Sequence, residues 1–100
     1  MIVRYRDQAR FDLDNIHRYI EDRNPRAAMN VVSRIRSAAD RLGAWPLMGH
    51  AGQAPGTYEW VVVGLPYVIV YEIIEAVDEV AIIAVFHGKQ DRSNMPGERD

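Results

Sequence analysis

The three histidines are the side chains of this chain best suited to acid–base or metal chemistry near neutral pH. His17, His50 and His87 have no metal-ligand spacing among them, and no acidic or basic partner stands beside His87 in the sequence. The chain contains no cysteine, which excludes a thiolate zinc site, a cysteine nucleophile and a disulfide framework. We therefore predict no metal site, no cofactor and no catalytic residue.

Other residues with chemical potential also lack the required spacing. Asp12 and Asp14 lie two positions apart on an expected helix, so their carboxylates point in different directions and form no catalytic pair. The serines occupy no nucleophile elbow, and the glycines match neither nucleotide-binding fingerprint. These residues are Ser33, Ser37 and Ser93, and Gly49, Gly52, Gly56 and Gly64.

Composition limits the classes of partner. The 100 residues are 48% hydrophobic and 26% charged, as expected for one globular domain, and the net charge is −2. A protein that grips nucleic-acid phosphates by itself usually carries a clear basic excess, which this chain lacks. No signal peptide is visible after Met1, and the apolar stretch from Trp60 to Tyr71 is too short to span a bilayer. We expect a cytoplasmic protein without membrane contact.

Hydrophobic periodicity predicts the elements that position these residues. Asp7 is the expected N-cap of a helix, Asn24-Pro25 starts a second helix, and Gly43 is expected just past its end. The expected strands are residues 2–5, 57–63, 67–74 and 79–87, the expected helices are 8–22 and 25–42, and residues 44–56 form a loop. The fold class is α+β in the order β-α-α-β-β-β, with a helical hairpin on one face of a mainly antiparallel sheet. Residues 1–92 form a single domain, and 93–100 form a flexible tail.

The expected sheet carries more apolar surface than one helical hairpin can cover. In the strand 67–74, Val68 and Val70 lie on the face opposite Tyr67 and Ile69, and both faces are apolar apart from Glu72. Either the loop 44–56 folds over the second face through Trp45, Leu47 and Met48, or a partner segment binds there. The two explanations can share the area, and both remain open.

Five segments in order resemble one family of small toxins. They are 7–20, 25–28, the Leu42 to Gly49 region with Pro46, 64–71 and 85–92. Together they resemble the RelE/ParE superfamily of toxins from bacterial type II toxin–antitoxin pairs over about residues 3–92. The resemblance implies the α+β fold predicted above.

The superfamily is divided in action, and the sequence favours one branch. RelE-like members cut messenger RNA in the ribosome, whereas ParE-like members poison DNA gyrase. RelE-like nucleases place an arginine where this chain has Val68 and a basic residue where it has Gln90, and they often carry an aromatic residue or histidine near the C-terminus, where this chain has Asn94-Met95-Pro96. We therefore expect a ParE-like inhibitor that is not an enzyme. The alternatives are a ribosome-dependent mRNA endoribonuclease and a degenerate family member that only binds antitoxin.

The resemblance implies two protein partners. A cognate ParD-like antitoxin would neutralise the toxin in a hetero-oligomer, DNA gyrase would be the target, and operator DNA would be bound only through the antitoxin. The basic edge of the second helix and the apolar strand residues are the candidate antitoxin contacts, and the chain's C-terminal region holds the candidate target contacts. The former are Arg34, Arg41, Trp60, Val61, Val63, Val68 and Val70, and the latter are His87, Lys89 and Arg92.

Overall fold

The computed structural model describes residues 1–89 of the chain. Its strands are β1 (Ile2–Tyr5), β2 (His50–Ala51), β3 (Tyr58–Val61), β4 (Tyr67–Ile74) and β5 (Glu79–His87), its helices are α1 (Asp7–Glu21) and α2 (Pro25–Ala44), and two single 3-10 turns are η1 (Pro46–Met48) and η2 (Glu75–Val77). The expected C-terminal tail and Arg92 lie outside these residues.

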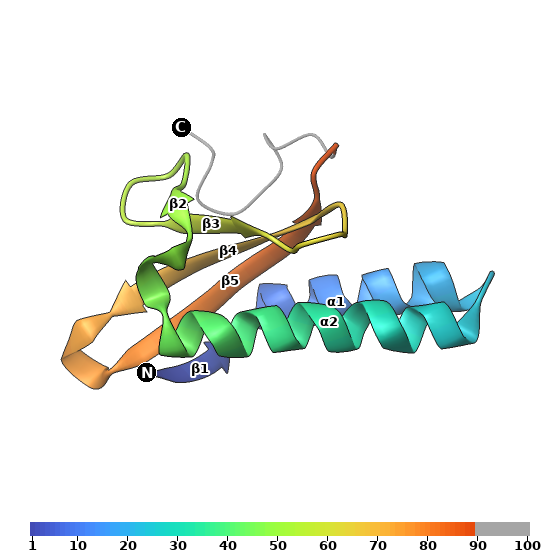
Figure 1. Ribbon diagram of the computed structural model, residues 1–100, viewed down its shortest axis with the longest axis horizontal. Helices are drawn as coiled ribbons and strands as arrows, with labels where there is room; N and C mark the ends of the chain where they lie inside the picture. The colour runs from blue at the N-terminus through green and yellow to red at the C-terminus, as the bar shows by residue number, and fades with distance from the viewer. Residues whose placement is uncertain (90–100) are drawn as a thin grey trace.

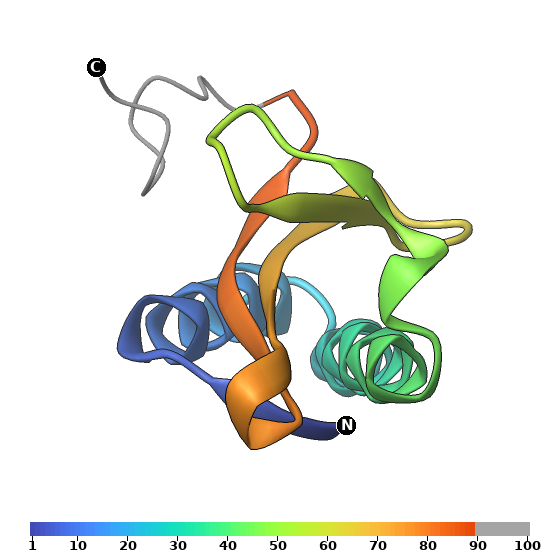
Figure 2. The ribbon, with the colours of Figure 1, turned by 90° about the vertical axis from the view of Figure 1, so that its left-hand side faces the viewer.

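The five strands form one mixed sheet in the order β1-β5-β4-β3-β2. β1 runs parallel to β5, and all other neighbours are antiparallel. Both helices lie on the same side of the sheet as an antiparallel hairpin (Figures 1 and 2). The α+β prediction is confirmed, with the two-residue strand β2 as an addition that the sequence did not indicate.

The helix boundaries differ from prediction by one or two residues at both ends of α1 and at the C-terminal end of α2. Asn24 caps α2 as expected, accepting a hydrogen bond from the Ala27 N–H at 3.1 Å. Asp7 is the first residue of α1 rather than its cap, and its carboxylate there complements the positive end of the helix. Gly43 lies inside α2, and our assignment of it to the position beyond the helix end was wrong.

The close approach of the N-terminal segment to α2 explains why a glycine occupies position 43 inside the helix. A Cβ atom there would lie 2.7 Å from Val3 Cγ2 and 2.8 Å from the Met1 carbonyl oxygen. The Met1 amino group donates a hydrogen bond to the Gly43 carbonyl oxygen at 2.9 Å. The glycine thus serves packing between two segments that are far apart in the sequence.

The main core lies between the sheet and the helices. Its largest fully buried side chains on the helix side are Ile35, Leu42, Ile69, Tyr71 and Ile82. A smaller cluster on the opposite face contains Val68, Val70, Ala84 and Phe86. The alternation of side chains along β4 produces this division, and a register shift after Val70 leaves Ile83 without a directly opposite residue.

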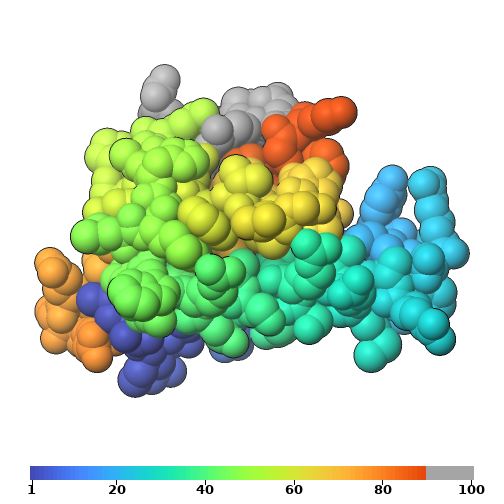
Figure 3. Space-filling view, in the orientation of Figure 1, coloured from blue at the N-terminus to red at the C-terminus, as the bar shows by residue number. Residues whose placement is uncertain are grey.

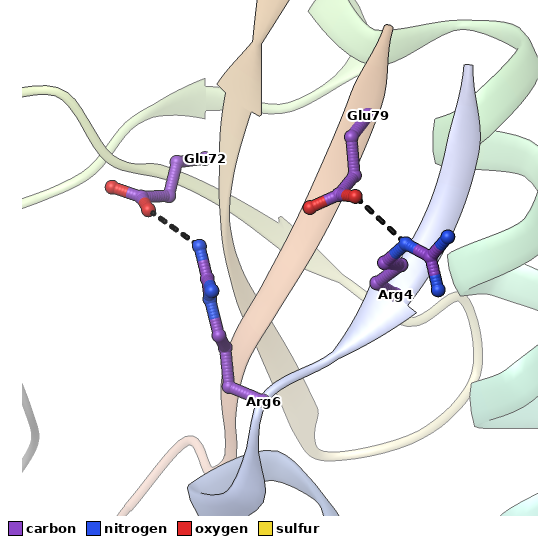
Figure 4. A network of polar contacts seen from close by, with 4 residues as sticks. All are labelled: Arg4, Arg6, Glu72 and Glu79. Atoms are coloured by element: carbon purple, nitrogen blue, oxygen red, sulfur yellow. Dashed lines mark hydrogen bonds and ion pairs between the residues drawn. The ribbon is translucent and has the colours of Figure 1, made fainter. Parts of the chain in front are cut away.

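Charged side chains occupy one end of the sheet face opposite the helices. Arg4 Nε lies 2.8 Å from Glu79 Oε2, and Arg6 Nη2 lies 3.5 Å from Glu72 Oε1 (Figure 4). These pairs link β1 and the residue that follows it to β5 and β4, and because both arginines are more than half exposed, each pair contributes at most about 1 kcal/mol. The apolar part of this face is therefore confined to the other end of the sheet.

The loop after α2 packs on the helix side. Met48 joins the main core, whereas Trp45 and Leu47 are 68% and 73% exposed. The Tyr71 hydroxyl donates to the Pro46 carbonyl at 2.7 Å and accepts from the Gly49 N–H at 3.0 Å. The explanation in which Trp45, Leu47 and Met48 cover the second face of the sheet is therefore wrong. Within residues 1–89 no helix is long and apolar enough to cross a membrane.

Candidate functional site

A groove of about 230 Å³ lies between α2 and the end of β3. Four of the seven predicted antitoxin-contact residues line it together: Arg34, Arg41, Trp60 and Val63. Ser37 and Ala38 complete the helix side and Val62 the strand side. We call this surface the α2–β3 groove. Its helix side is one stripe, because residues three, four and seven positions apart share a face of a helix.

Arg34 links the two sides of the groove by a hydrogen bond from α2 to the turn that follows β3. Its terminal Nη2 donates to the Val63 carbonyl oxygen at 2.6 Å. Gly64 has a positive φ of 78°, and a Cβ at this position would lie 2.8 Å from the same nitrogen. A glycine therefore permits both the turn conformation and the arginine contact. The remaining guanidinium donors of Arg34 are available for a carboxylate.

The groove continues into an exposed apolar surface at the C-terminal end of α2. Arg41 also borders a second hollow of about 590 Å³ with Trp45, Pro46, Leu47 and Met48. Among residues 1–89, neither Arg34 nor Arg41 forms an ion pair. Figure 3 shows this surface as the front of α2, with the turn after β3 lying against it and the 45–48 segment at its end. Trp45 and Leu47 are binding candidates that the sequence did not indicate, because they were considered only as a possible cover for the second face of the sheet.

The outer edge of β3 is open beside the groove. β2 pairs only with Tyr58 and Glu59, so Trp60 and Val61 have no strand neighbour on that side in the described part of the chain. Val61 and Val63 are 50% and 70% exposed. An exposed edge of this kind can accept an extended peptide as an additional strand.

The sheet separates the other predicted antitoxin contacts from the groove. Val61 lies opposite Val68 in the β3–β4 pairing, on the face away from the helices, whereas Trp60 lies on the helix side. Val68 and Val70 are only 8% and 4% exposed and belong to the smaller cluster. The structure thus brings Arg34, Arg41, Trp60 and Val63 together and places Val68 and Val70 in a different, buried environment.

The predicted target contacts lie at the far end of β5. The His87 ring packs edge-on against Tyr67 with 5.5 Å between centroids, and its Nδ1 accepts a hydrogen bond from the Lys89 N–H at 3.1 Å. Lys89 is exposed. Arg92 lies outside the described residues, so its position relative to this pair is not defined.

Asp12 has a structural partner that the sequence analysis did not identify. Its Oδ2 accepts from the Val85 N–H at 2.9 Å and its Oδ1 from Gln8 Nε2 at 2.8 Å. β1 ends at Tyr5, opposite Ile82, and Asp12 satisfies the β5 amide beyond that point. Burial raises the pKa of the Asp12 carboxyl, and the hydrogen bond from Val85 opposes the rise. The position of Asp12 between Ala9 and Leu13 on the apolar stripe was the available signal.

The histidines and carboxylates do not assemble into a metal site within residues 1–89. On α1, His17 Nδ1 lies 3.8 Å from Glu21 Oε1. Across the β2–β3 pair, His50 Nε2 lies 3.9 Å from Glu59 Oε1. Asp14 is exposed, whereas the Asp12 carboxylate is hydrogen-bonded to β5. The two carboxylates therefore lie in different surroundings, and their failure to form a catalytic pair stays a prediction.

Comparison with known proteins places the chain in a family. The family model "ParE toxin of type II toxin-antitoxin system, parDE" matches residues 3–92 of this chain. A protein of Sinorhizobium fredii (strain NBRC 101917 / NGR234), Y4kP, which is named as a candidate toxin, is 39% identical over 88 residues, or 88% of each chain.

Two solved structures share the fold. A chain from the chromosomal ParDE toxin–antitoxin system of P. aeruginosa has a TM-score of 0.77 at 20% identity, covering 87% of this chain and 95% of that chain. A chain from the toxin–antitoxin complex RelBE2 of Mycobacterium tuberculosis has a TM-score of 0.60 at 26% identity, with 86% and 95% covered. The chain therefore belongs to the ParE toxin family of type II toxin–antitoxin systems, within the RelE/ParE superfamily.

Proposed function

We propose that this ParE-family toxin acts by binding DNA gyrase and trapping its cleaved complex with DNA, and that a cognate ParD-like antitoxin neutralises it. The observation that carries the antitoxin part is the α2–β3 groove, where Arg34 and Arg41 have no carboxylate partner among residues 1–89 and lie beside exposed apolar side chains. The gyrase part rests on membership of the ParE family.

The groove suits an acidic, partly apolar polypeptide segment. Carboxylates on such a segment would form charge-assisted hydrogen bonds with Arg34 and Arg41, which are about twice as strong as neutral ones. Apolar anchors would cover Trp45 and Leu47, since aromatic side chains and arginines carry much of the free energy of protein–protein binding. An extended stretch of the same segment could pair with the open edge at Val61.

The surroundings of the titratable groups support an inhibitor over a ribonuclease. Metal-independent RNA cleavage needs cationic groups around an acid–base pair to stabilise the phosphorane. In the described residues, the pocket beside His87 is lined by one charged residue, Asp12, which is negative. Val68 occupies the position of the RelE-like arginine and is buried. These placements favour binding without catalysis.

Purified gyrase provides the direct test of the proposed target. The toxin should inhibit DNA supercoiling and cause cleaved DNA to accumulate with the enzyme, and translation should be intact in the early phase of induced expression. Unimpaired supercoiling together with cleavage of ribosome-bound message would replace this proposal with the endoribonuclease. Normal growth under induction would indicate a degenerate member.

The groove has a separate test that uses two variants of α2. Arg41→Glu should weaken binding to the antitoxin encoded beside the toxin by at least about tenfold, because a charge-assisted hydrogen bond contributes about 1.5–3 kcal/mol. Arg26→Glu makes the same charge change on the same helix, outside the groove, and should leave the affinity nearly unchanged. Equal losses in both variants would indicate a nonspecific charge effect, and equal retention would place the antitoxin elsewhere.

A further inference from the structure

Another pocket, separate from the α2–β3 groove and from the hollow beside Trp45, lies on the other side of the helical hairpin, between α1 and the adjoining ends of β4 and β5. Its volume is about 440 Å³, and we call it the α1 pocket. It is lined by Asp12, Asn15, Ile16 and Tyr19 from α1, Tyr67 from β4, and Val85, Phe86 and His87 from β5. None of these residues lines the α2–β3 groove. In Figure 2, α1 and α2 lie side by side beneath the sheet, so the two sites flank the hairpin.

The α1 pocket has one negative charge in its described lining and no lysine or arginine. Asp12 is half-buried, and its two hydrogen bonds within residues 1–89, from Val85 and Gln8, come from neutral donors. A carboxylate has about four acceptor positions, so about half of its capacity remains. Burial of this charge raises the pKa of Asp12, and none of the causes of the shift within residues 1–89 is a cation.

Aromatic rings and apolar side chains form the other walls. Tyr19 is exposed at the rim and Tyr67 is buried deeper, while Ile16, Val85 and Phe86 supply apolar surface. The chain already uses Tyr19 to hold a guanidinium: Arg23 lies over its ring, with 5.4 Å from Cζ to the centroid. Arg18 donates to the Asn15 side-chain oxygen at 3.2 Å at the same rim. The walls therefore present groups that already contact arginines of this chain.

We propose that the α1 pocket binds one guanidinium group, an arginine side chain of a partner protein. A cation gains more from Asp12 than a neutral donor does, and a planar guanidinium can both bond to a carboxylate and stack on a tyrosine ring, whereas an ammonium lacks the planar surface. A nucleotide base would bring phosphates, and no cation in the described lining faces them. The site therefore selects a cationic side chain.

This inference does not depend on gyrase being the target. It concerns a different set of residues from the groove, and the probe that tests it is a small molecule rather than either proposed partner. If the toxin failed to inhibit gyrase, the pocket could still bind arginine. Conversely, an empty pocket would leave the groove and the target proposal intact.

The experiment is an NMR titration of the full ¹⁵N-labelled chain with Nα-acetyl-arginine amide. Shifts should concentrate at the Val85 and His87 amides. Nα-acetyl-citrulline amide, which has nearly the same shape without the charge, should bind at least about tenfold more weakly, since a single ionic hydrogen bond contributes about 1.5–3 kcal/mol. Equal shifts from both probes, or shifts spread over the exposed acidic residues, would overturn the proposal.

Two isosteric variants on α1 sharpen the test. Asp12→Asn removes the charge and keeps an oxygen that can accept from the Val85 N–H, so the arginine probe should lose its binding while the spectrum stays folded. Asp14→Asn makes the same change at an exposed position and should bind like the original chain. Retained binding in Asp12→Asn, or stronger binding of a mononucleotide than of the arginine probe, would contradict the assignment. If Asp12→Asn does not fold, Tyr19→Ala at the exposed rim should weaken binding instead, and unchanged affinity there would count against the proposal.

Discussion

The Tyr71 hydroxyl should be the strongest single polar contribution to the segment that borders the α2–β3 groove. The side chain is fully buried, and its hydroxyl bonds to both Pro46 and Gly49 across the turn that carries Trp45 and Leu47. A Cβ at Gly49 would lie 2.5 Å from this oxygen, so the glycine allows the approach. Burial raises the pKa of Tyr71, and the hydroxyl therefore keeps the proton that it donates to Pro46.

The expected cost of Tyr71→Phe follows from these two bonds. The substitution leaves the Pro46 carbonyl and the Gly49 N–H without this partner, at about 1–3 kcal/mol for each group that stays buried. Both residues are partly exposed, so water compensates in part, and we expect a total loss of about 2 kcal/mol. The phenylalanine ring keeps the stacking against Tyr58, whose centroid lies 5.5 Å away. The packing is therefore largely retained, and the loss is polar.

Urea unfolding followed by circular dichroism measures this loss directly. For a domain of this size, about 2 kcal/mol corresponds to a decrease in Tm of roughly 8–16 °C. Tyr58→Phe is the matched control, because no hydrogen bond of its hydroxyl is seen in the described residues, and it should change the free energy of unfolding by less than about 0.5 kcal/mol. Equal effects of the two substitutions would refute the assignment of the turn's stability to the Tyr71 hydroxyl.

Three further predictions concern glycine packing and pH. Gly43→Ala should destabilise the fold by about 1–3 kcal/mol in urea unfolding, because the new Cβ meets Val3 and Met1, and a neutral result would mean that β1 can shift freely. Gly64→Ala should lower Tm and weaken antitoxin binding together, since it strains a residue with φ 78° and displaces Arg34; a change in only one would separate the turn from the groove. The raised pKa of Asp12 means that the folded state binds its proton more tightly than the unfolded chain, so this carboxyl adds stability as pH falls through its folded pKa towards 3.8, and that gain is absent at neutral pH. The unfolding free energy of the original chain minus that of Asp12→Asn should therefore rise on acidification, and a fall would contradict the sign.

Local sequence patterns correctly predicted the strands that are marked by the types of their own residues. The strands at 2–5, 67–74 and 79–87 agree with the structure because β-branched and aromatic residues fill each run and turn residues bound it. β2 could not be predicted in this way. His50–Ala51 has only two residues and little strand propensity, and it forms because β3 offers an edge for pairing at Tyr58 and Glu59.

Long-range packing explains the errors. A glycine near a helix end is ordinarily a sign of termination, and nothing near Gly43 in the sequence reveals that Val3 and Met1 cross the helix there. The apolar residues of the 44–56 loop posed the same difficulty, because composition says that Met48 is buried but not on which face of the sheet. Both questions are decided by the order of strands, which places β1 at one edge and β2 at the other.

The candidate groove was half predictable. The spacing of Arg34 and Arg41 put both on one stripe of the second helix, and the structure keeps them together. Strand alternation should also have separated Trp60 from Val61, but the sequence analysis pooled them because it treated apolar character on either face as one surplus. Val63 follows the end of β3 and therefore does not obey the alternation of the strand. It lines the groove because the chain turns at Gly64.

The net charge of −2 conceals two local environments of opposite sign. Among residues 1–89, the lining of the α2–β3 groove carries two arginines and no carboxylate, whereas that of the α1 pocket carries a carboxylate and no lysine or arginine. Electrostatic attraction between proteins is screened over about 8–10 Å in physiological salt, so each partner senses the local charge more than the total. An acidic segment in the groove and a cationic side chain in the pocket would then attract different partners to one small domain. Because the sites share no lining residue, an antitoxin segment in the groove does not fill the α1 pocket, and whether two partners compete would depend on how far each one extends beyond its own site.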